Sequence, residues 1–452
     1  MNNKIYPQRF KGKYRIIKDC LAIFLLFIYM IGAWIPYYRG FDMPNQAVMI
    51  DLPNRNAYLF NIIIWPEELY YLTLILILSA IGLFICTSLF GRVWCGFTCP
   101  HTTMVDVFVM IERLIQGDRN ARIKLDETAM NSEKFLKKSI THVIWLTISF
   151  LFGFGWVSYF YGSEYLMKDL LSFSITINGL IWLLSLTATT YLFAGFLREK
   201  VCMHMCPYGR FQSGLVDENT ILVTYHNWRG EPRGKGDLSG DCIDCNKCVV
   251  ACPMGIDIRN GLQMPCIGCG LCIDACNEVM LKMNRKPNLI EYTSTSRTNL
   301  LKNKIYPRLL TGKIIIYCSV FTAAAVTLGY LLMMKSPIIL QIDKNNCPLL
   351  TITPDGSIRN NYRLNIVNKT PFLQDNLCLS LSENYLMNIQ ILGNDYKNES
   401  CFALKPGESL NSQLFVKLPY NKIDNAKYKN IYFQLKNRDI SAATSSVFYI
   451  HD

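Results

Sequence analysis

Two closely spaced cysteine runs constrain the fold of this chain more than any other feature. The first run holds Cys242, Cys245, Cys248 and Cys252, followed by Pro253, and the second holds Cys266, Cys269, Cys272 and Cys276. Two residues between successive thiols let one loop wrap three corners of a cubane, and the fourth cysteine of each run reaches the other cubane. The spacing therefore predicts a bacterial-type ferredoxin module with two [4Fe–4S] clusters.

The same spacing predicts which cysteines belong to which cluster. One set is expected to be Cys242, Cys245, Cys248 and Cys276, and the other Cys266, Cys269, Cys272 and Cys252. A pair of zinc knuckles and a disulfide framework are the alternatives for so many cysteines. The doubled run and the Cys-Pro pair favour iron–sulfur ligation, with the thiols kept reduced in the cytoplasm.

Composition points to membrane spans beside soluble parts. Apolar residues make up 51% of the 452-residue chain, and charged residues only 18%. The net charge of +12 could indicate a nucleic-acid-binding protein, but the basic residues gather in loops between apolar segments. That distribution is typical of the positive-inside rule, so we expect a lipid environment and no nucleic-acid partner.

The apolar segments predict a multidomain membrane protein with five transmembrane helices. Residues 1–19 form a basic cytoplasmic N-terminus, and residues 20–225 a four-helix membrane core. A linker and the ferredoxin module are expected over residues 226–312. The five spans are expected at about residues 20–38, 70–90, 139–161, 175–197 and 313–335, each long enough to cross the hydrocarbon core.

After the fifth span the sequence changes to short alternating runs broken by turn residues. This pattern over residues 336–452 predicts an immunoglobulin-like antiparallel β-sandwich, which the span count places in the periplasm. The segment contains Cys347, Cys378 and Cys401. A Cys378–Cys401 disulfide and buried free thiols both remain open.

Two CxxxCP motifs follow the second and fourth expected spans. They contain Cys95 and Cys99, and Cys202 and Cys206. On a helix, cysteines four apart share one face, and the proline favours a new helix that begins beside Cys99 or Cys206. A helix N-terminus favours thiolate over thiol. Four soft donors could therefore converge below the membrane and act on Cu(I) or as redox-active thiols.

Further soft donors surround the second motif. Met203, His204 and Met205 fill the space between Cys202 and Cys206, and His101 follows the first motif. Imidazole and thioether groups are copper ligands, although methionines at a span end more often pack or contact lipid. These residues are therefore candidate metal ligands beside the four cysteines.

Several longer stretches carry a resemblance to a known family. They cover residues 46–53, 65–68, 91–95, 117–122, 186–191, 228–234 and 240–245. These stretches resemble the cytochrome c oxidase accessory protein family CcoG, also called FixG or RdxA, and the resemblance extends over nearly the whole chain.

The resemblance implies a bacterial inner-membrane protein with two [4Fe–4S] clusters that serves assembly of cbb3-type cytochrome c oxidase by reducing Cu(II) to Cu(I). It implies partners among that oxidase or its copper-handling assembly factors, and a cytoplasmic electron donor. All eight ferredoxin cysteines match, and so do Cys95, Cys99, Cys202 and Cys206 as the reactive copper site. The chain departs from the family at His101, usually a polar amide, and in the Met-His-Met filling of the second motif.

Two other functions remain open at the level of the sequence. One is a quinol-linked membrane ferredoxin that transfers electrons without copper. The other is a copper-delivery or assembly chaperone whose clusters are purely structural and never change oxidation state.

Overall fold

The computed structural model describes residues 4–39, 43–53, 55–234, 239–294, 311–334, 336–345, 348, 350–354, 356–370, 373–381, 387–391, 399–405, 407–419, 427–437 and 441–450. The chain forms two compact units. One comprises Met1–Ile35, Ala47–Ala57 and Ile64–Leu328, and the other comprises Pro36–Gln46, Tyr58–Ile63 and Gly329–Asp452.

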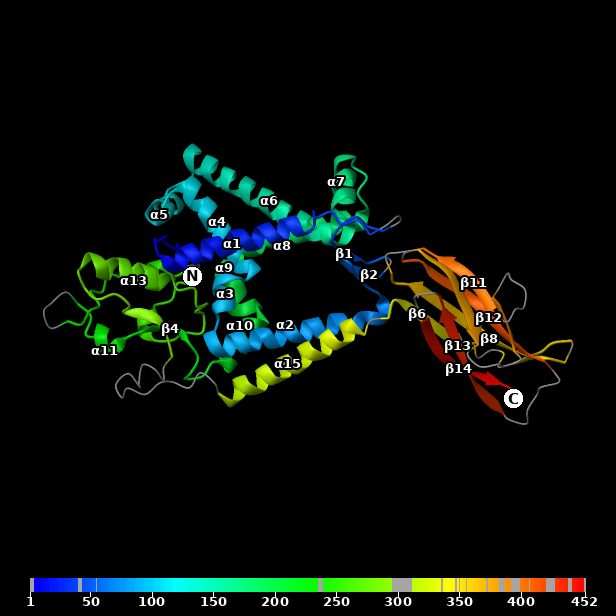
Figure 1. Ribbon diagram of the computed structural model, residues 1–452. Helices are drawn as coiled ribbons and strands as arrows, with labels where there is room; N and C mark the ends of the chain where they lie inside the picture. Colours follow the sequence, from blue (N-terminus) through cyan, green and yellow to red (C-terminus); the bar gives the residue numbers. More distant parts are fainter. Residues whose placement is uncertain are drawn as a thin grey trace. The chain divides into compact units, whose positions relative to one another are not determined.

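Helices dominate the chain up to the ferredoxin module (Figure 1). Three short strands, β1 (Val48–Asp51), β2 (Asn56–Leu59) and β3 (Ile62–Ile64), follow the first helix, and the turn η1 (Pro66–Glu68) precedes the second. The helices are α1 (Lys13–Gly32), α2 (Leu69–Phe90), α3 (Val93–Phe97), α4 (Pro100–Gln116), α5 (Arg119–Glu127), α6 (Ser132–Tyr161), α7 (Ser163–Leu171), α8 (Ile177–Leu192), α9 (Arg198–Lys200) and α10 (Pro207–Leu215). Two π-helical turns, η2 (Phe193–Leu197) and η3 (Val201–Met205), flank α9.

Four helices in the described part of the chain are long and apolar enough to cross a membrane. They are Leu69–Phe90, Ser132–Tyr161, Ile177–Met205 and Gly312–Met333, the last being α15. Each matches a span expected from the sequence. However, α6 begins earlier than expected, and the helix that begins at Ile177 continues past the expected end through η2 and η3. These four helices indicate that the chain is a membrane protein.

The first of the five expected spans is not among these helices. The helix α1 is present, but it starts at Lys13 and ends at Gly32, six residues before the expected end at Tyr38. Its apolar part, from Cys20 to Gly32, is shorter than the ~20 residues that a perpendicular span needs. The five-helix count is thus not confirmed, and a membrane crossing by α1 stays a prediction.

The ferredoxin module is built on a two-stranded antiparallel sheet. Strand β4 (Leu222–Tyr225) pairs with β5 (Ile290–Thr293), with Leu222 opposite Thr293. Between them lie α11 (Asn227–Gly230), α12 (Lys247–Ala251), η4 (Ile258–Asn260) and α13 (Leu271–Lys282). Because β4 pairs with β5, the module begins at β4, a few residues before the expected boundary at residue 226.

The second unit contains the predicted antiparallel β-sandwich. One sheet has the order β10 (Asn388–Ile391), β12 (Ser409–Leu418), β8 (Ile358–Asn368), β6 (Ile338–Lys344), with β7 (Thr351–Ile352) also on β8; the other has the order β11 (Glu399–Leu404), β9 (Gln374–Leu381), β13 (Tyr428–Lys436), β14 (Ser441–Tyr449). Alternate residues of both sheets, such as Leu364 and Phe433, are fully buried in one shared core. This period of two is what the sequence predicted.

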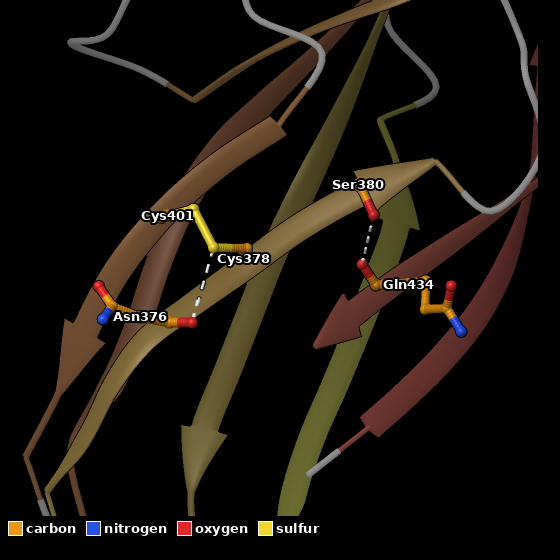
Figure 2. The surroundings of a disulfide bond; sticks show 5 residues. All are labelled: Asn376, Cys378, Ser380, Cys401 and Gln434. Carbon is orange, nitrogen blue, oxygen red and sulfur yellow. Dashed lines mark hydrogen bonds between the residues drawn. A yellow bond between two sulfur atoms is a disulfide. The ribbon is translucent and has the colours of Figure 1, made fainter. Parts of the chain in front are cut away.

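A disulfide joins two neighbouring strands of the sandwich. Cys378 of β9 and Cys401 of β11 lie directly opposite each other, and their sulfur atoms are bonded (Figure 2). This settles the question left open by the sequence in favour of the disulfide. Cys347 lies outside the described residues.

Candidate iron–sulfur and thiolate site

Left-handed backbone shapes both cysteine loops of the ferredoxin module in the same way. Asp244 and Asn246, on either side of Cys245, both have φ of 55°. Gly268 and Gly270 flank Cys269 in the second loop, with φ of 60° and 70°. Glycine, Asn and Asp are the residues that adopt this conformation at least cost. The local sequence therefore bends each loop around its middle thiol.

The first set of four cysteines lies together as the spacing predicted. Cys248 stands on α12 and Cys276 on α13, and both share a core with Cys242. Burial, together with the nearby thiols of Cys248, Cys242 and Cys245, raises the pKa of Cys276 to about 12. Cys245 is the exposed member. A cluster bound here would approach the solvent at Cys245.

The second set surrounds a cavity inside the module. Cys252, Cys266, Cys269 and Cys272 line this space together with Cys248 of the first set and apolar side chains. Burial raises the pKa of Cys272 well above its usual range, and the other three thiols of the set raise it too. Thiols that hold their protons so strongly need a cation to ionise, and iron supplies that charge. The donor set and the cavity fit a [4Fe–4S] cluster.

No three His, Cys, Asp or Glu side chains within the described ranges are gathered tightly enough to hold a single metal ion. A cubane binds one thiolate at each of four irons, so its ligands stand further apart than those of one ion. The CxxxCP cysteines are likewise not gathered into such a site within the described ranges.

Arg259, on η4, contacts the first cluster loop and is a residue that the sequence did not single out. It is 7% exposed, and its guanidinium donates to Asp257 Oδ1 at 2.8 Å and to Asp244 Oδ1 at 2.5 Å. It also donates to Asn246 Oδ1. The residues on both sides of Cys245 are thus held by one cation. The same charge lowers the pKa of Cys248, although burial raises it to about 11.

The proline of each CxxxCP motif begins a new helix, as the sequence predicted, but the two cysteines of each pair do not lie on one helix. Cys99 immediately precedes α4 and Cys206 immediately precedes α10, each with proline at the first helical position. Cys95 is buried on α3, while Cys202 lies in the π-helical turn η3. Burial raises the pKa of Cys95 to about 12, Arg92 lowers it, and Cys99, Cys202 and Cys206 raise it. The structure therefore brings the four thiols near one another.

The first motif packs directly against the loop of the second cluster set. A Cβ atom on Gly96 would lie 2.7 Å from the carbonyl oxygen of Ile267 and 3.0 Å from Cys269 Cα. Cys95 and Cys269 are buried in one core, against which Cys202, Cys252 and Cys266 also pack. The second cluster set is thus the one beside the CxxxCP thiols.

A buried polar network links the same parts. Arg92 Nε donates to Gln212 Oε1 at 2.9 Å, and Arg92 Nη1 donates to the carbonyl oxygen of Met264 at 2.6 Å. The Cys95 thiol donates to the same Gln212 oxygen at 3.4 Å. Arg92 belongs to the Gly-Arg-Val-Trp-Cys stretch noted above, but nothing in the sequence pointed to Gln212.

The four additional copper-ligand candidates do not face one point. His101 Nε2 lies 3.0 Å from the carbonyl oxygen of Arg198; since a carbonyl only accepts, this nitrogen is the donor and only Nδ1 remains for a metal. Met203 packs toward the second cluster set. His204 and Met205 instead line an open hollow of about 800 Å³ that Cys206 also lines.

Comparison with known proteins finds three matching families. Residues 197–295 match a 4Fe-4S dicluster domain, residues 72–117 match a 4Fe-4S binding domain, and residues 328–451 match the IG-like fold at the C-terminus of FixG. The matches cover the ferredoxin module, the first CxxxCP motif and the sandwich. The iron–sulfur domains support the prediction of two clusters.

Relatives match over most of the chain. Protein RdxA of Cereibacter sphaeroides is 42% identical over 371 residues, which cover 80% of this chain and 79% of that protein. The nitrogen fixation protein FixG of Rhizobium meliloti is 36% identical over 404 residues, 81% of this chain and 77% of FixG. A crystal structure of a FixG-related protein from Vibrio parahaemolyticus covers 25% of this chain and 97% of its own, at 19% identity and a TM-score of 0.20. That score carries no argument about the fold.

Proposed function

Since the chain belongs to the family of FixG and RdxA, an iron–sulfur family of oxidoreductase type, we propose that it reduces Cu(II) to Cu(I) for assembly of cbb3-type cytochrome c oxidase. The observation that carries this proposal is the shared core of Cys95 and Cys202 with the second cluster set. Thiolates that favour Cu(I) over Cu(II) thus lie beside the cysteines of the cluster that would carry the electron.

The arrangement gives the electron a direction. When bound, the clusters supply one electron at a time. The exposed Cys245 offers the entrance from a cytoplasmic donor, and Cys252 with its three partners lies at the exit beside Cys95. Each Cu(II) ion at the CxxxCP thiolates takes one electron and becomes Cu(I). The soft thiolate and thioether donors stabilise this product, which adds driving force.

The positions of the spans support a proposed orientation. Both CxxxCP motifs and the ferredoxin module are separated from each other by an even number of candidate spans, whereas α15 alone separates the module from the sandwich. We place the module in the cytoplasm and the sandwich in the periplasm of a bacterial inner membrane. A disulfide between Cys378 and Cys401 agrees with an oxidising compartment. Alkaline phosphatase fused to the C-terminus should then be active in cells, and an inactive fusion would reverse the orientation.

The test of copper reduction uses the protein purified anaerobically in detergent. Its clusters are reduced, the reductant is removed, Cu(II) is added, and cluster absorbance is followed together with Cu(I) capture by a chromogenic chelator. We expect one Cu(I) for each electron that the clusters lose. Cys99→Ser and Cys206→Ser should abolish this reaction and keep both clusters, while Cys318→Ser, an exposed thiol on α15, should not change it.

The outcomes separate the proposal from its alternatives. Copper that binds while the clusters stay reduced would favour the assembly chaperone. Oxidation of the clusters by a quinone analogue, with no reaction toward Cu(II), would favour the quinol-linked ferredoxin. An open hollow of about 1340 Å³, lined by His142, Trp145 and Phe196 and extending to Met203, offers such a ligand space and makes this arm worth including.

A further inference from the structure

A hollow beside α4 is lined by four arginines. Arg9, Arg15, Arg113 and Arg198 all border it, against two carboxylates, Asp106 and Glu199. We propose that this hollow binds the phosphate-bearing headgroup of an anionic phospholipid. The proposal goes beyond electron transfer to copper and does not depend on it.

The arginines keep donors that no described residue accepts. Arg15 Nε and Arg198 Nη1 are both buried without a hydrogen-bond partner within the described residues. Arg198 is only 6% exposed. Buried polar groups are almost always hydrogen-bonded, and an unmet donor on a charged group is costly. Both donors belong to residues that line this hollow, and Arg198 also lines the larger hollow beside Trp145, so an acceptor bound here could reach them.

The carboxylates that could serve as acceptors are already engaged. Asp19 accepts from Arg9 at 2.6 Å and from Arg15 at 2.5 Å. Asp106 lies 3.2 Å from Arg15 and 3.1 Å from Lys18. Of the two carboxylates that line the hollow, Asp106 is therefore already paired, and only Glu199 remains to balance the arginines.

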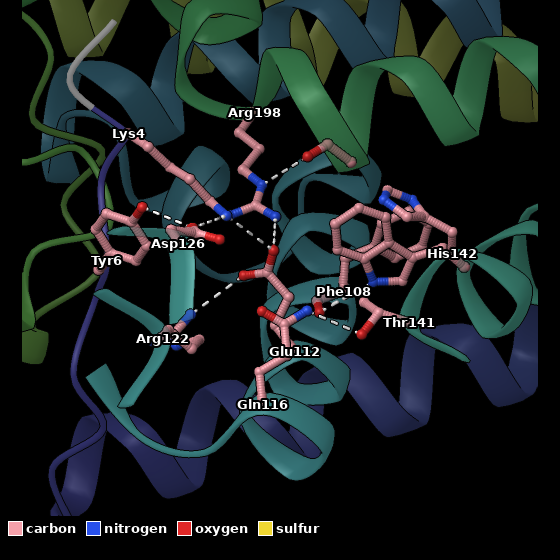
Figure 3. Close-up of polar contacts among 12 residues, drawn as sticks. Lys4, Tyr6, Phe108, Glu112, Gln116, Arg122, Asp126, Thr141, His142 and Arg198 are labelled. Carbon is pink, nitrogen blue, oxygen red and sulfur yellow. Dashed lines mark hydrogen bonds and ion pairs between the residues drawn. The ribbon is translucent and has the colours of Figure 1, made fainter. Parts of the chain in front are cut away.

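Arg198 is oriented by the carboxylate of Glu112 and by a backbone carbonyl. Its Nη2 donates to Glu112 Oε1 at 2.6 Å, while Arg122 pairs with the other oxygen, Oε2, at 3.2 Å (Figure 3). Its Nε donates to the carbonyl oxygen of Gly195 at 2.9 Å. With both of these atoms occupied, Nη1 is the part of the guanidinium left for a ligand.

Arg113 lies near several like charges. Burial lowers the pKa of Arg113, the charges of Arg9 and Arg15 lower it as well, and Asp118 raises it. An anion placed among these three guanidinium groups would remove that repulsion. Arginine forks match the geometry of phosphate oxygens, which accept several hydrogen bonds at once.

The surroundings of Arg113 favour a lipid as the source of the phosphate. Met110 and Leu114 stand one turn apart on α4 and next to Arg113, and they are 37% and 78% exposed. Helix α4 lies in the chain between two candidate spans, α2 and α6. An apolar pair beside a cationic hollow suits an acyl chain beside a headgroup at the membrane interface.

A bound headgroup would join the membrane part to the ferredoxin module. The hollow is also lined by Ala251, Pro253 and Leu271, which neighbour Cys252 and Cys272 of the second cluster set. The lipid phosphate would then contact α4 on one side and the module's loops on the other. We expect it to hold the second cluster set against the CxxxCP motifs.

The test measures lipid binding by the full-length, cluster-containing protein after removal of lipid in detergent. Thermal unfolding and native mass spectrometry are followed with phosphatidylglycerol, phosphatidylcholine or inorganic phosphate. We expect phosphatidylglycerol alone to bind and to raise the unfolding temperature. Arg113→Gln should weaken its apparent affinity about tenfold or more, the value of one charge-assisted hydrogen bond. The Arg113→Lys variant should bind phosphatidylglycerol with an affinity between those of the unchanged protein and the Arg113→Gln variant.

Matched controls make each outcome decisive. Arg119→Gln removes a nearby arginine at the start of α5 that does not line the hollow, so it should bind lipid as the unchanged protein does. Equal binding of phosphatidylglycerol by the Arg113→Gln and Arg119→Gln variants would overturn the proposal. Equal protection by inorganic phosphate would also overturn it and assign the hollow to a free anion. Neither result bears on copper reduction, which is measured separately.

Discussion

At the scale of single residues, one buried cation governs the loop that surrounds the first cluster set. Arg259 bonds to residues on both sides of Cys245 and lies near enough to Cys248 to lower its pKa. A positive charge at this distance favours the reduced form of a cluster, since reduction adds a negative charge. The same residue therefore affects both loop geometry and reduction potential.

We predict that Arg259→Gln lowers the reduction potential of one cluster by roughly tens of millivolts and leaves the other unchanged. The measurement is a redox titration followed by electron paramagnetic resonance. Lys282→Gln, which removes a solvent-exposed cation from α13, is the control and should shift neither cluster. If Arg259→Gln moved both potentials equally, a general loosening of the module would be the better explanation.

Glu112 is a buried carboxylate whose charge affects the stability of the fold. It is 1% exposed and pairs with Arg198, Arg122 and Lys4 (Figure 3). Burial raises its pKa, but Arg198, Lys4 and Arg122 together lower the pKa below the usual 4.5. A lowered folded-state pKa means that the stabilisation is complete above pH 4.5 and is lost as the pH falls through the lower folded value.

We therefore predict that Glu112→Gln destabilises the protein at neutral pH by about 3–5 kcal/mol, because it leaves buried cations unpaired. Thermal unfolding measured from pH 7 to well below pH 4 would show this loss, and the difference from the unchanged protein should stay constant above pH 4.5 and shrink below it, as Glu112 takes up its proton. Glu133→Gln, at an exposed ion pair on α6, should have little effect at any pH. A loss that stayed constant down to the lowest pH would contradict the ionised Glu112.

At the scale of elements, the contact between α3 and the second cysteine loop sets the distance over which the proposed electron transfer occurs. Gly96 has no side chain, so the two backbones approach closely, with Gly268 O only 3.0 Å from a Cβ position at residue 96. Backbone atoms cannot move aside as a flexible side chain can. The glycine is thus required by packing between elements far apart in the sequence.

We predict that Gly96→Ala separates α3 from the loop, destabilises the protein by about 1–3 kcal/mol and slows cluster oxidation by Cu(II). Stopped-flow absorbance measures the rate, and iron content shows whether both clusters remain. Gly214→Ala, on α10 with no atom within 4 Å of the new methyl group, is the matched control and should keep the full rate. An unchanged rate in Gly96→Ala would indicate that copper receives its electron elsewhere.

At the scale of the whole molecule, the number of clusters distinguishes two uses of the CxxxCP cysteines. The first motif lies within a segment that matches a 4Fe-4S binding domain, yet residues 72–117 hold only Cys86, Cys95 and Cys99. A cubane takes four thiolates. The segment therefore cannot hold a cluster by itself, and with the second motif it would have the four.

We predict about eight iron atoms and eight acid-labile sulfides per chain, as two cubanes contain. Iron and sulfide analysis of anaerobically purified protein gives this number directly. About twelve iron atoms, falling to about eight in Cys99→Ser, would assign a third cubane to the CxxxCP cysteines. That result would displace the copper site from these thiols.

The sequence by itself determined which cysteines have the spacing of two cluster-ligand sets and which segments are apolar enough to enter a membrane. Both depend on distances along the chain: two residues between thiols set the loop, and about 20 apolar residues set a span. The alternation of the sandwich strands was predictable for the same reason. The start of α1 at Lys13 was harder to predict, because apolar content does not mark where a helix begins in a basic segment.

Only the tertiary structure decided which cluster set lies beside the CxxxCP thiols, since Gly96 and Ile267 are far apart in the sequence. It likewise directed His101 Nε2 toward the carbonyl oxygen of Arg198, and it placed His204 and Met205 around a hollow that Cys206 also lines. Arg259, Gln212 and the arginines around Arg113 acquire their roles from partners on other elements. Packing and unmet hydrogen bonds are properties of the folded chain, and no spacing in the sequence encodes them.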